Sequence, residues 1–502
     1  MRLRTHSEKV NGEVGQDNGD IVERRNKKRR WCHNLIFLSK CPGTLLSLLL
    51  LLFVTTLSIV LFTFVLSPSR RQERRMNKYF SRVIHSESEN SLEAVFRQPT
   101  HYPWNMLYAT APADEQQWNF QPLWSIVRKP DPTFVGTPLY CVRNGRLYGW
   151  KRHQENARQH LYYGLRIHTY EQLISRSLAL ARYAVSNSHQ KKIDARVVEL
   201  VTEPFPFNFE WMDLTTCQEK SFLNGIPFFA YLTFAHKDPD DTCMPLATPT
   251  YEQWRKYQNI VSSRHWTSVF HRQEEENPWN TKINKAVWRG STTGEKWMFP
   301  NWRDLPRVKL VQIAAENSNL IDAGLTSFNN RNDTEIKEII DMGLAGKRIE
   351  MHDYQKYKSI IDIDGNSWSS RFADLLCMNS VVIKVEPRWI DYFYPELQPW
   401  VHYVPVHANL SNLVEIVILV TSDDDKIQEN MRQIVQNANV WCRSKMTATQ
   451  LSIDMLWLLI SYVEMLKKEN MRSGDFNRWK GDRWRAHEWI EIPFNLSFSS
   501  DI

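Results

Sequence analysis

The chain has 502 residues, which is too long for one ordinary hydrophobic core, and it has the composition of a folded protein. Apolar residues make up 42% and charged residues 24%, which excludes a wholly disordered chain, a collagen-like repeat and a multi-span membrane protein. Most of the net charge of +7 lies in residues 1–42, and residues 68–502 hold 53 Lys/Arg against 51 Asp/Glu. The folded part therefore lacks the positive field of a nucleic-acid-binding protein.

A charge-free run of 25 residues, 43–67, follows the basic segment. As a helix it would be about 37 Å long, enough to cross a hydrocarbon core about 30 Å thick. A core helix is usually shorter, and a cleaved signal peptide has an apolar region of roughly 7–15 residues near the start of the chain. We therefore expect a transmembrane signal anchor between a cytoplasmic basic tail, residues 1–42, and a stem, residues 68–105.

Three N-glycosylation sequons follow the expected anchor, at Asn332, Asn409 and Asn495. They favour a lumenal C-terminal part, and thus a single-pass type II protein of the Golgi or endoplasmic reticulum membrane. Five of the seven cysteines also follow the anchor. Cys217 and Cys243 are a candidate disulfide pair, and the odd number leaves at least one thiol free or paired between chains.

Beyond residue 105 the chain becomes aromatic and globular. Its patterns predict strands at residues 197–201, 227–234, 286–288, 357–363, 380–385 and 402–406. They predict helices at residues 250–262, 308–317, 369–376, 412–420, 424–437 and 448–468. The alternation of strand and helix between residues 308 and 440 predicts a parallel α/β lobe.

The first stretch that suggests chemistry is WRGSTTG, residues 288–294. Backbone N–H groups, three hydroxyls and glycines that allow close approach suit a diphosphate, although an ordinary polar turn would look similar. Two arginines at helical spacing follow and could neutralise phosphates, or could lie on a solvated helix face. The candidate contacts here are Arg289, Gly290, Ser291, Thr292, Arg303 and Arg307.

The second stretch is DIDGNSWSSR, residues 362–371, in which a buried strand ends in a small, polar turn before a helix. Ligands of open α/β sheets bind outside the carboxyl ends of strands, so this turn is a credible nucleotide-sugar pocket. Its candidate contacts are Asp364, Gly365, Ser367, Ser370 and Arg371. Asp362 and Asp364 also resemble the paired carboxylates that hold a divalent metal, but a structural role is favoured for them.

The third stretch, residues 386–406, is aromatic, and packing is the favoured interpretation of it. His402, within it, is more typical of a structural histidine than of a base.

Three motifs together carry a resemblance: WRGSTTG, then YKSIIDIDGNSWSSRFADLL, then NSVVIKVEPRWIDYFYPELQPWVHYVPV. The stretch from residue 288 to 406 resembles the capsule-associated-protein, or lipopolysaccharide-modifying, type of glycosyltransferase. That family is related to protein O-glucosyltransferases and fungal capsular xylosyltransferases. The resemblance extends more loosely over residues 140–470.

The resemblance implies an α/β protein of two Rossmann-like lobes, the GT-B arrangement, behind the transmembrane helix. We expect an acceptor-side lobe at residues 106–280, a UDP-sugar-binding lobe at residues 281–480 and a tail at residues 481–502. It also implies a UDP-glucose or UDP-xylose donor, inversion at the anomeric carbon, and no metal or other cofactor. Ser291 and Arg371 match diphosphate contacts, and either Arg303 or Arg307 matches a third.

An inverting transfer needs a base for the acceptor hydroxyl. Members of the family that this chain resembles carry an Asp shortly before a Pro at the end of a strand in the first lobe. The matching stretch here, VVELVTEPFP at residues 197–206, has no Asp, and Glu203 is its nearest carboxylate. We therefore take Glu203 as the expected base.

The leading interpretation is a glycosyltransferase that moves glucose or xylose from UDP to a hydroxyl of a glycan or protein in the secretory pathway. Its partners would be the donor, the acceptor and a membrane, without nucleic acid. One alternative is a non-catalytic member that binds UDP or a glycan. Another is a metal-dependent transferase that uses Asp362 and Asp364.

Overall fold

The computed structural model describes ten stretches of the chain: residues 74–81, 139–151, 154–155, 161–187, 193–210, 227–235, 244–260, 263–294, 299–473 and 489–494. The predicted basic tail, the anchor at residues 43–67, most of the stem and the sequon at Asn495 lie outside them. The chain divides into the compact units Met1–Asn77 and Lys78–Ile502. All the strands, and helices α8 to α17, belong to the second unit.

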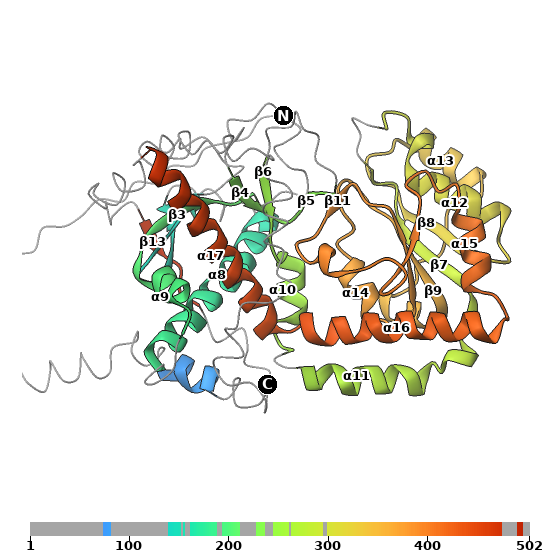
Figure 1. Ribbon diagram of the computed structural model, residues 1–502. Coiled ribbons are helices and arrows are strands. Elements are labelled where there is room, and N and C mark those ends of the chain that lie inside the picture. The colour runs from blue at the N-terminus through green and yellow to red at the C-terminus, as the bar shows by residue number, and fades with distance from the viewer. Residues whose placement is uncertain are drawn as a thin grey trace, which may run out of the picture. The chain divides into compact units, whose positions relative to one another are not determined.

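A five-stranded parallel sheet dominates the C-terminal half of the chain (Figure 1). Its strands are β7 (Ile283–Ser291), β8 (Ile321–Ser327), β9 (Tyr357–Asp362), β10 (Val381–Val385) and β12 (Val404–Val406). They lie in the order β12-β10-β9-β7-β8, and each pairing is parallel. In chain order the sheet reads 2-1-3-4-5, a doubly wound sheet that changes direction between β7 and β9.

Helices connect these strands, and a single apolar core fills the space between sheet and helices. Those between successive strands are α12 (Pro306–Glu316), α13 (Asp333–Asp341) and α14 (Phe372–Leu376), and α15 (Leu413–Val420) and α16 (Asp425–Lys445) follow β12. Local signals fix where they begin. Pro306 stands in the first turn of α12, where its missing N–H is not needed, and the side chain of Asp424 accepts hydrogen bonds from the first backbone N–H groups of α16. The predicted parallel α/β arrangement is confirmed, although several elements end elsewhere than predicted.

The preceding part of the chain forms smaller sheets. An antiparallel sheet has the order β13-β2-β1-β3, and a parallel pair joins β4 to β6. The bounds are β1 (Leu139–Arg143), β2 (Arg146–Trp150), β3 (Phe205–Asn208), β4 (Pro227–Ala230), β6 (Met244–Ala247) and β13 (Trp489–Glu491). A parallel bridge between Phe209 and Phe229 links the end of β3 to β4. Since the larger of these sheets is antiparallel, a second Rossmann-like lobe, and with it the GT-B arrangement, stays a prediction.

The strand predicted at residues 197–201 is wrong, because these residues lie in helix α9 (Ala195–Thr202). The run of valines suggested a strand, but Asp194 caps a helix here by accepting a hydrogen bond from the Arg196 N–H. Val197 and Leu200, three residues apart, form the buried face. Contacts of α9 with α8 (Leu161–Asn187) and α17 (Ala448–Ser473) therefore outweigh strand propensity.

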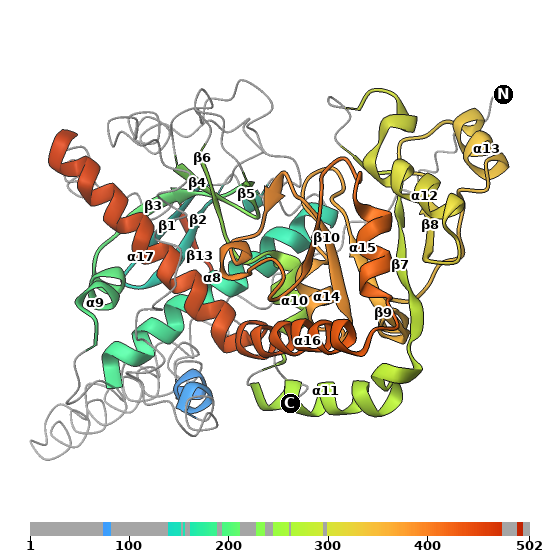
Figure 2. The same ribbon diagram turned by 45° about the vertical axis from the view of Figure 1, so that its right-hand side comes forward.

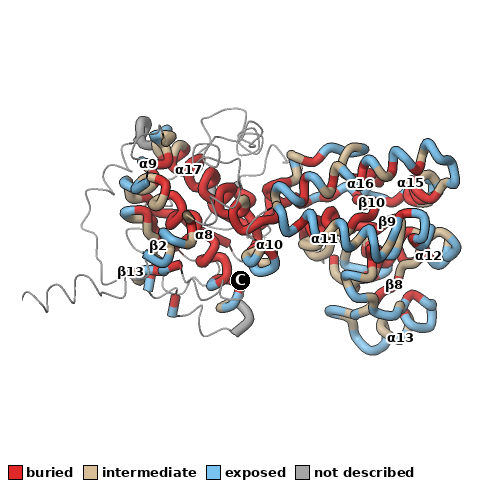
Figure 3. The backbone as a smooth tube through the Cα atoms, turned by 90° about the horizontal axis from the view of Figure 1, so that it is seen from below, coloured by how far each residue is buried: buried red, intermediate tan, exposed pale blue. Residues whose placement is uncertain are grey.

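Helix α17 follows the parallel sheet in the sequence but packs against α8, so this helix returns to the region of β1, β2 and β3 (Figure 2). Most of α8 and α17 is buried, whereas α13 and one side of α16 are exposed (Figure 3). Among the described residues, no single helix is long and apolar enough to cross a membrane. One pair of described helices, Asp425–Lys445 and Ala448–Lys468, passes that test when the two are taken together, and the chain bends by 73° between them.

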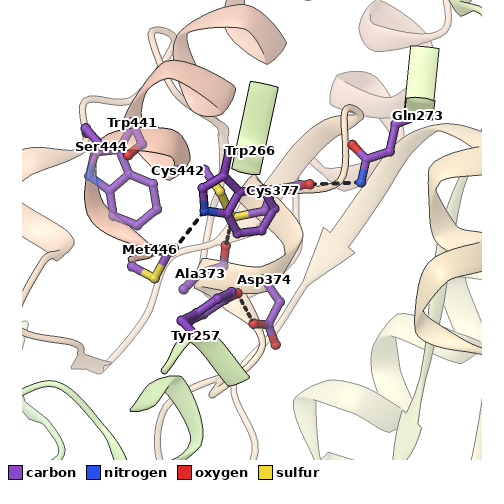
Figure 4. Close-up of a disulfide and its surroundings, with 10 residues drawn as sticks. All are labelled: Tyr257, Trp266, Gln273, Ala373, Asp374, Cys377, Trp441, Cys442, Ser444 and Met446. Atoms are coloured by element: carbon purple, nitrogen blue, oxygen red, sulfur yellow. Dashed lines mark hydrogen bonds between the residues drawn. A yellow bond between two sulfur atoms is a disulfide. The ribbon is translucent and has the colours of Figure 1, made fainter. Parts of the chain in front are cut away.

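A disulfide joins Cys377, just after α14, to Cys442 in α16 (Figure 4). The same short helix is also held by α10 (Tyr251–Tyr257), because Lys256 and Tyr257 both contact the carboxylate of Asp374. Helix α14 is therefore fixed on two sides. The predicted pair of Cys217 and Cys243 lies outside the described residues.

Replacing both Cys377 and Cys442 by serine should lower the free energy of unfolding by roughly 2–4 kcal/mol, because the unfolded chain regains the freedom that the cross-link removes. Denaturant titration of the variant against the parent protein measures this. The single variant Cys442→Ser breaks the same bond and should lose a similar amount. A loss below about 1 kcal/mol in both would contradict a stabilising disulfide.

Candidate functional site

The doubly wound order puts the change of direction between β7 and β9, where ligands of such sheets bind. The turns that follow these two strands carry the two motifs, WRGSTTG and DIDGNSWSSR. Because the strands are parallel neighbours, their carboxyl ends lie at the same edge of the sheet. The fold therefore brings both motifs together.

Arg307, in the first turn of α12, connects the two turns. Its Nη1 donates to Thr293 Oγ1 at 2.6 Å and reaches Ser291 Oγ at 3.5 Å, on the β7 side. Its Nε and Nη2 donate to the backbone carbonyls of Asp364 and Ile363, at 2.8 and 3.1 Å, on the β9 side. The side chain is buried, and burial together with the charge of Arg371 lowers the pKa of Arg307 to about 10.

Gly365 is required by this close approach. A Cβ atom at this position would lie 3.0 Å from Arg307 Nη2 and 3.2 Å from Thr293 Oγ1. Both distances are tighter than ordinary carbon contacts, so a side chain would force the guanidinium away. In the same pocket, the backbone N–H of Gly294 donates to Asn366 Oδ1 at 3.2 Å. The packing of the second motif against the first motif therefore explains the glycine at position 365.

Arg371 immediately precedes α14, and its Nη1 donates to the carbonyl of Arg289 at 2.8 Å. The residue is only half-buried, and its charge acts on the buried guanidinium of Arg307. The two cations repel each other, while the carboxylates of Asp362 and Asp364 act on Arg307 in the opposite direction. The site therefore has the electrostatics of an anion pocket, with Ser291 and Thr293 as additional hydrogen-bonding groups.

Several residues predicted to contact the diphosphate lie in this region but take no part in the hydrogen bonds of Arg307 described above. The guanidinium of Arg289 is occupied by Asp322, at 2.6 Å, and by backbone carbonyls. The hydroxyl of Thr292 donates to the Asn329 carbonyl at 3.1 Å. Ser367 is buried and Ser370 half-buried, both in the turn between β9 and α14. Gly290, in β7, takes part in the pairing with β8.

Arg303 points elsewhere. Its guanidinium pairs with Glu338 at 2.6 Å and lies 4.5 Å from the ring of Trp302, and about half of the side chain is exposed. Of the two arginines between which the sequence left a choice, the structure brings only Arg307 to the two motifs. The spacing could not decide this, because both residues lie near the start of α12.

Asp362 and Asp364 share a buried lysine. Lys384 Nζ lies 2.8 Å from Asp362 Oδ2 and 3.0 Å from Asp364 Oδ1, and Ser369 donates to Asp362. Burial acts to lower the pKa of Lys384, but the two carboxylates outweigh it and raise that pKa above its usual value. Burial also raises the pKa of Asp364. These aspartates are thus engaged in an ion-paired cluster, and no group of three metal-ligating side chains occurs within the described stretches.

The expected base, Glu203, does not end a strand. It caps the C-terminus of α9, where its N–H donates to the Glu199 carbonyl at 2.8 Å. The strand in this region, β3, ends instead at Asn208. Phe209 then forms a bridge to Phe229, and the fully buried Glu210 donates its N–H to the Phe229 carbonyl at 2.8 Å. The alternating aromatic sequence FPFNF at residues 205–209 is the signal that could have identified this strand.

Two of the predicted glycosylation sites are accessible. Asn332 and Asn409 are exposed, the first as the cap of α13 and the second in the loop before α15. His402 accepts a hydrogen bond on Nδ1 from the Gln398 N–H at 3.0 Å, and burial lowers its pKa. That contact is typical of the structural role expected for this histidine.

A doubly wound sheet with two arginines and two hydroxyls at its change of direction is characteristic of nucleotide- and phosphate-binding α/β proteins. The chain belongs to glycosyl transferase family 90, whose model matches residues 195–480. It is therefore a member of a glycosyltransferase family.

Curated relatives include protein O-glucosyltransferase 1 of Homo sapiens, 34% identical over 152 residues, which are 30% of this chain and 36% of that protein. Protein O-glucosyltransferase 3 of Homo sapiens is 30% identical over 197 residues, 39% of this chain and 35% of that protein. The chain thus aligns with about a third of the length of these relatives. The predicted relation to capsular xylosyltransferases stays a prediction.

The substitution Lys384→Met should reduce the free energy of unfolding by roughly 3–5 kcal/mol at pH 7, because it leaves the buried carboxylate of Asp362 and the partly buried one of Asp364 without their cation. The pKa of Asp364 is higher in the folded protein than in the unfolded chain. Removal of the lysine raises the folded-state pKa further. The deficit should therefore shrink as the pH falls towards 4.

Denaturant titrations at several pH values measure this deficit. As a control, Lys309→Met removes a surface pair, in which Lys309 lies 3.9 Å from Asp304, and should change stability by less than about 0.5 kcal/mol. A deficit that stays constant with pH would contradict the assignment of the buried cluster.

Proposed function

We propose that this protein is a UDP-sugar-dependent, inverting glycosyltransferase that transfers glucose or xylose to a hydroxyl of a glycan or protein. The observation that carries the proposal is the meeting of Arg307, Arg371, Ser291 and Thr293 at the β7–β9 edge of the sheet. A diphosphate there would relieve the repulsion between the two guanidiniums and accept hydrogen bonds from the hydroxyls. As UDP leaves, the same cations would stabilise its developing negative charge.

The proposed reaction needs no metal for the diphosphate. In metal-dependent transferases paired carboxylates hold the cation, but here both Asp362 and Asp364 form ion pairs with Lys384. The positive charge that a divalent metal would bring to the phosphates is supplied by Arg307 and Arg371. This supports metal independence through the chemistry of the residues present.

We assign the general base to Glu210. Inversion requires a carboxylate on the acceptor side that takes the proton of the attacking hydroxyl. Glu210 lies two residues after the end of β3, next to the Phe209–Phe229 bridge that joins this segment to β4, and β4 pairs in parallel with β6. Glu203 lies at a helix end seven residues earlier and serves as the alternative.

The proposed setting is the lumen of the secretory pathway, with the chain anchored as a type II membrane protein by residues 43–67. The exposed sequons at Asn332 and Asn409 support a compartment where N-glycosylation occurs. The disulfide between Cys377 and Cys442 supports an oxidising one. Both features lie in the part of the chain that follows the predicted anchor.

Hydrolysis of a panel of UDP-sugars by the purified full-length protein, with and without EDTA, tests the reaction. We expect turnover of UDP-glucose or UDP-xylose that EDTA does not reduce. Arg371→Ala should weaken UDP binding by roughly 2–5 kcal/mol, since it removes a charged contact, whereas the matched control Arg303→Ala should leave it unchanged. Loss of turnover in EDTA would contradict metal independence, and UDP binding without turnover of any sugar would favour a non-catalytic member.

The base is tested by comparing Glu210→Gln with Glu203→Gln, two changes that keep the side-chain shape and remove the carboxylate. Glu210→Gln should retain UDP affinity and lose roughly 10²–10⁴-fold in turnover. Turnover by Glu210→Gln at the parent rate would reject Glu210. A large loss in Glu203→Gln alone would return the role to Glu203.

A further inference from the structure

Next to the diphosphate pocket lies a group of aromatic and polar side chains that the proposed chemistry does not use. We call Tyr231, Tyr251, Glu252 and Trp368 the Trp368 cluster. Trp368 belongs to the turn between β9 and α14, the turn that also holds Asp364 and Arg371. Its ring lies 6.3 Å from the ring of Tyr231, which directly follows β4. The Tyr231 ring in turn lies 5.5 Å from that of Tyr251, the first residue of α10.

Three polar atoms of the Trp368 cluster are buried without a hydrogen-bond partner. They are the Tyr231 hydroxyl, Trp368 Nε1 and Glu252 Oε2. Tyr231 is 0% and Trp368 7% exposed. A buried polar group that lacks a partner destabilises the folded state by about 1–3 kcal/mol, so a fold retains such groups where something else supplies the partner. The unsatisfied atoms include a donor, an acceptor and a hydroxyl that can serve as either.

The surroundings favour an uncharged ligand. The guanidinium of Arg166 lies 4.8 Å from the Tyr251 ring, and the carboxylate of Glu252 follows next in the chain. Asp391 accepts a hydrogen bond from Gln253 at 3.3 Å, and burial raises its pKa well above the usual value. The Trp368 cluster itself contains one carboxylate, Glu252, and no cation, which gives no net attraction for a second phosphate.

The Trp368 cluster is adjacent to residues that solvent reaches. Trp368 and its two serine neighbours are buried, but Asp364, Asn366, Ser370 and Arg371, in the same turn, are partly exposed. Aromatic rings offer apolar surface, and the unsatisfied atoms offer hydrogen bonds, which is the combination typical of sites for small polar molecules.

We propose that Tyr231, Glu252 and Trp368 form a sugar subsite that binds the pyranose ring of a neutral sugar through its hydroxyls. The inference rests on the proposed function, because the neighbouring diphosphate pocket defines what kind of substrate arrives here. The pyranose is either the sugar attached to UDP or a sugar of the acceptor glycan. The chemistry of recognition is the same for both, and the two sources respond differently in the experiment.

The test uses the full-length protein and the variants Tyr231→Phe and Trp368→Phe, which remove the unsatisfied atoms. The matched control is Trp457→Phe, because Trp457 is also buried with an unpartnered Nε1 but lies in α17, where its ring contacts Arg196 at 5.0 Å. Calorimetry gives the affinities for UDP, UDP-glucose and UDP-xylose. An array of neutral glycans reports acceptor binding, and thermal unfolding reports the stability of the free protein.

We expect both variants to bind UDP like the parent protein and to bind the pyranose three- to tenfold more weakly, as loss of one hydrogen bond predicts. The free Tyr231→Phe protein should unfold at the same or a higher temperature, because a hydroxyl without a partner has been removed. A purely structural hydroxyl would have the opposite effect on stability.

Weaker binding of UDP-sugars with unchanged UDP affinity assigns the subsite to the donor sugar. Weaker glycan binding on the array, with unchanged affinity for UDP-sugars, assigns it to the acceptor. Parent-like affinities for UDP-sugars and glycans, or losses no greater than in Trp457→Phe, would overturn the proposal. Failure of the parent protein to bind UDP would reject the proposed donor, and glycan binding on the array would still decide the subsite.

Discussion

The buried guanidinium of Arg307 is the contact on which the site depends, because it bonds to both turns that end the central strands of the sheet. Its hydrogen bonds reach Thr293 on one side and the carbonyls of Ile363 and Asp364 on the other. A cation with this little exposure to water needs such bonds to remain in the fold. Once they form, the two sequence motifs have a single relative position.

Arg371 is held more indirectly, through the short helix that follows it. Helix α14 has only five residues and little stability of its own. It is fixed because Asp374 contacts Lys256 and Tyr257 from α10, and because Cys377 is linked to Cys442 in α16. The position of this half-buried cation therefore depends on contacts from segments far away in the sequence.

Much of the C-terminal half could be predicted from local patterns. Strand β10 has the sequence VVIKV and is buried throughout, so its β-branched side chains and its burial point to the same structure. The valines of α9 favour a strand, but the helix cap and the packing against α8 and α17 stabilise a helix there. The wrong strand at α9 also placed Glu203 at a strand end, whereas it lies at the C-terminal end of a helix.

The sequence by itself determined the parallel α/β lobe, the two motifs and the family resemblance, because these depend on periodicity and on residue types close together in the chain. Only the tertiary structure decided which of Arg303 and Arg307 reaches the motifs, and that Lys384 occupies the paired aspartates. It also brought Tyr231 into contact with Trp368. These are contacts between residues far apart in the chain, and no local pattern specifies which partners the order of strands will bring together.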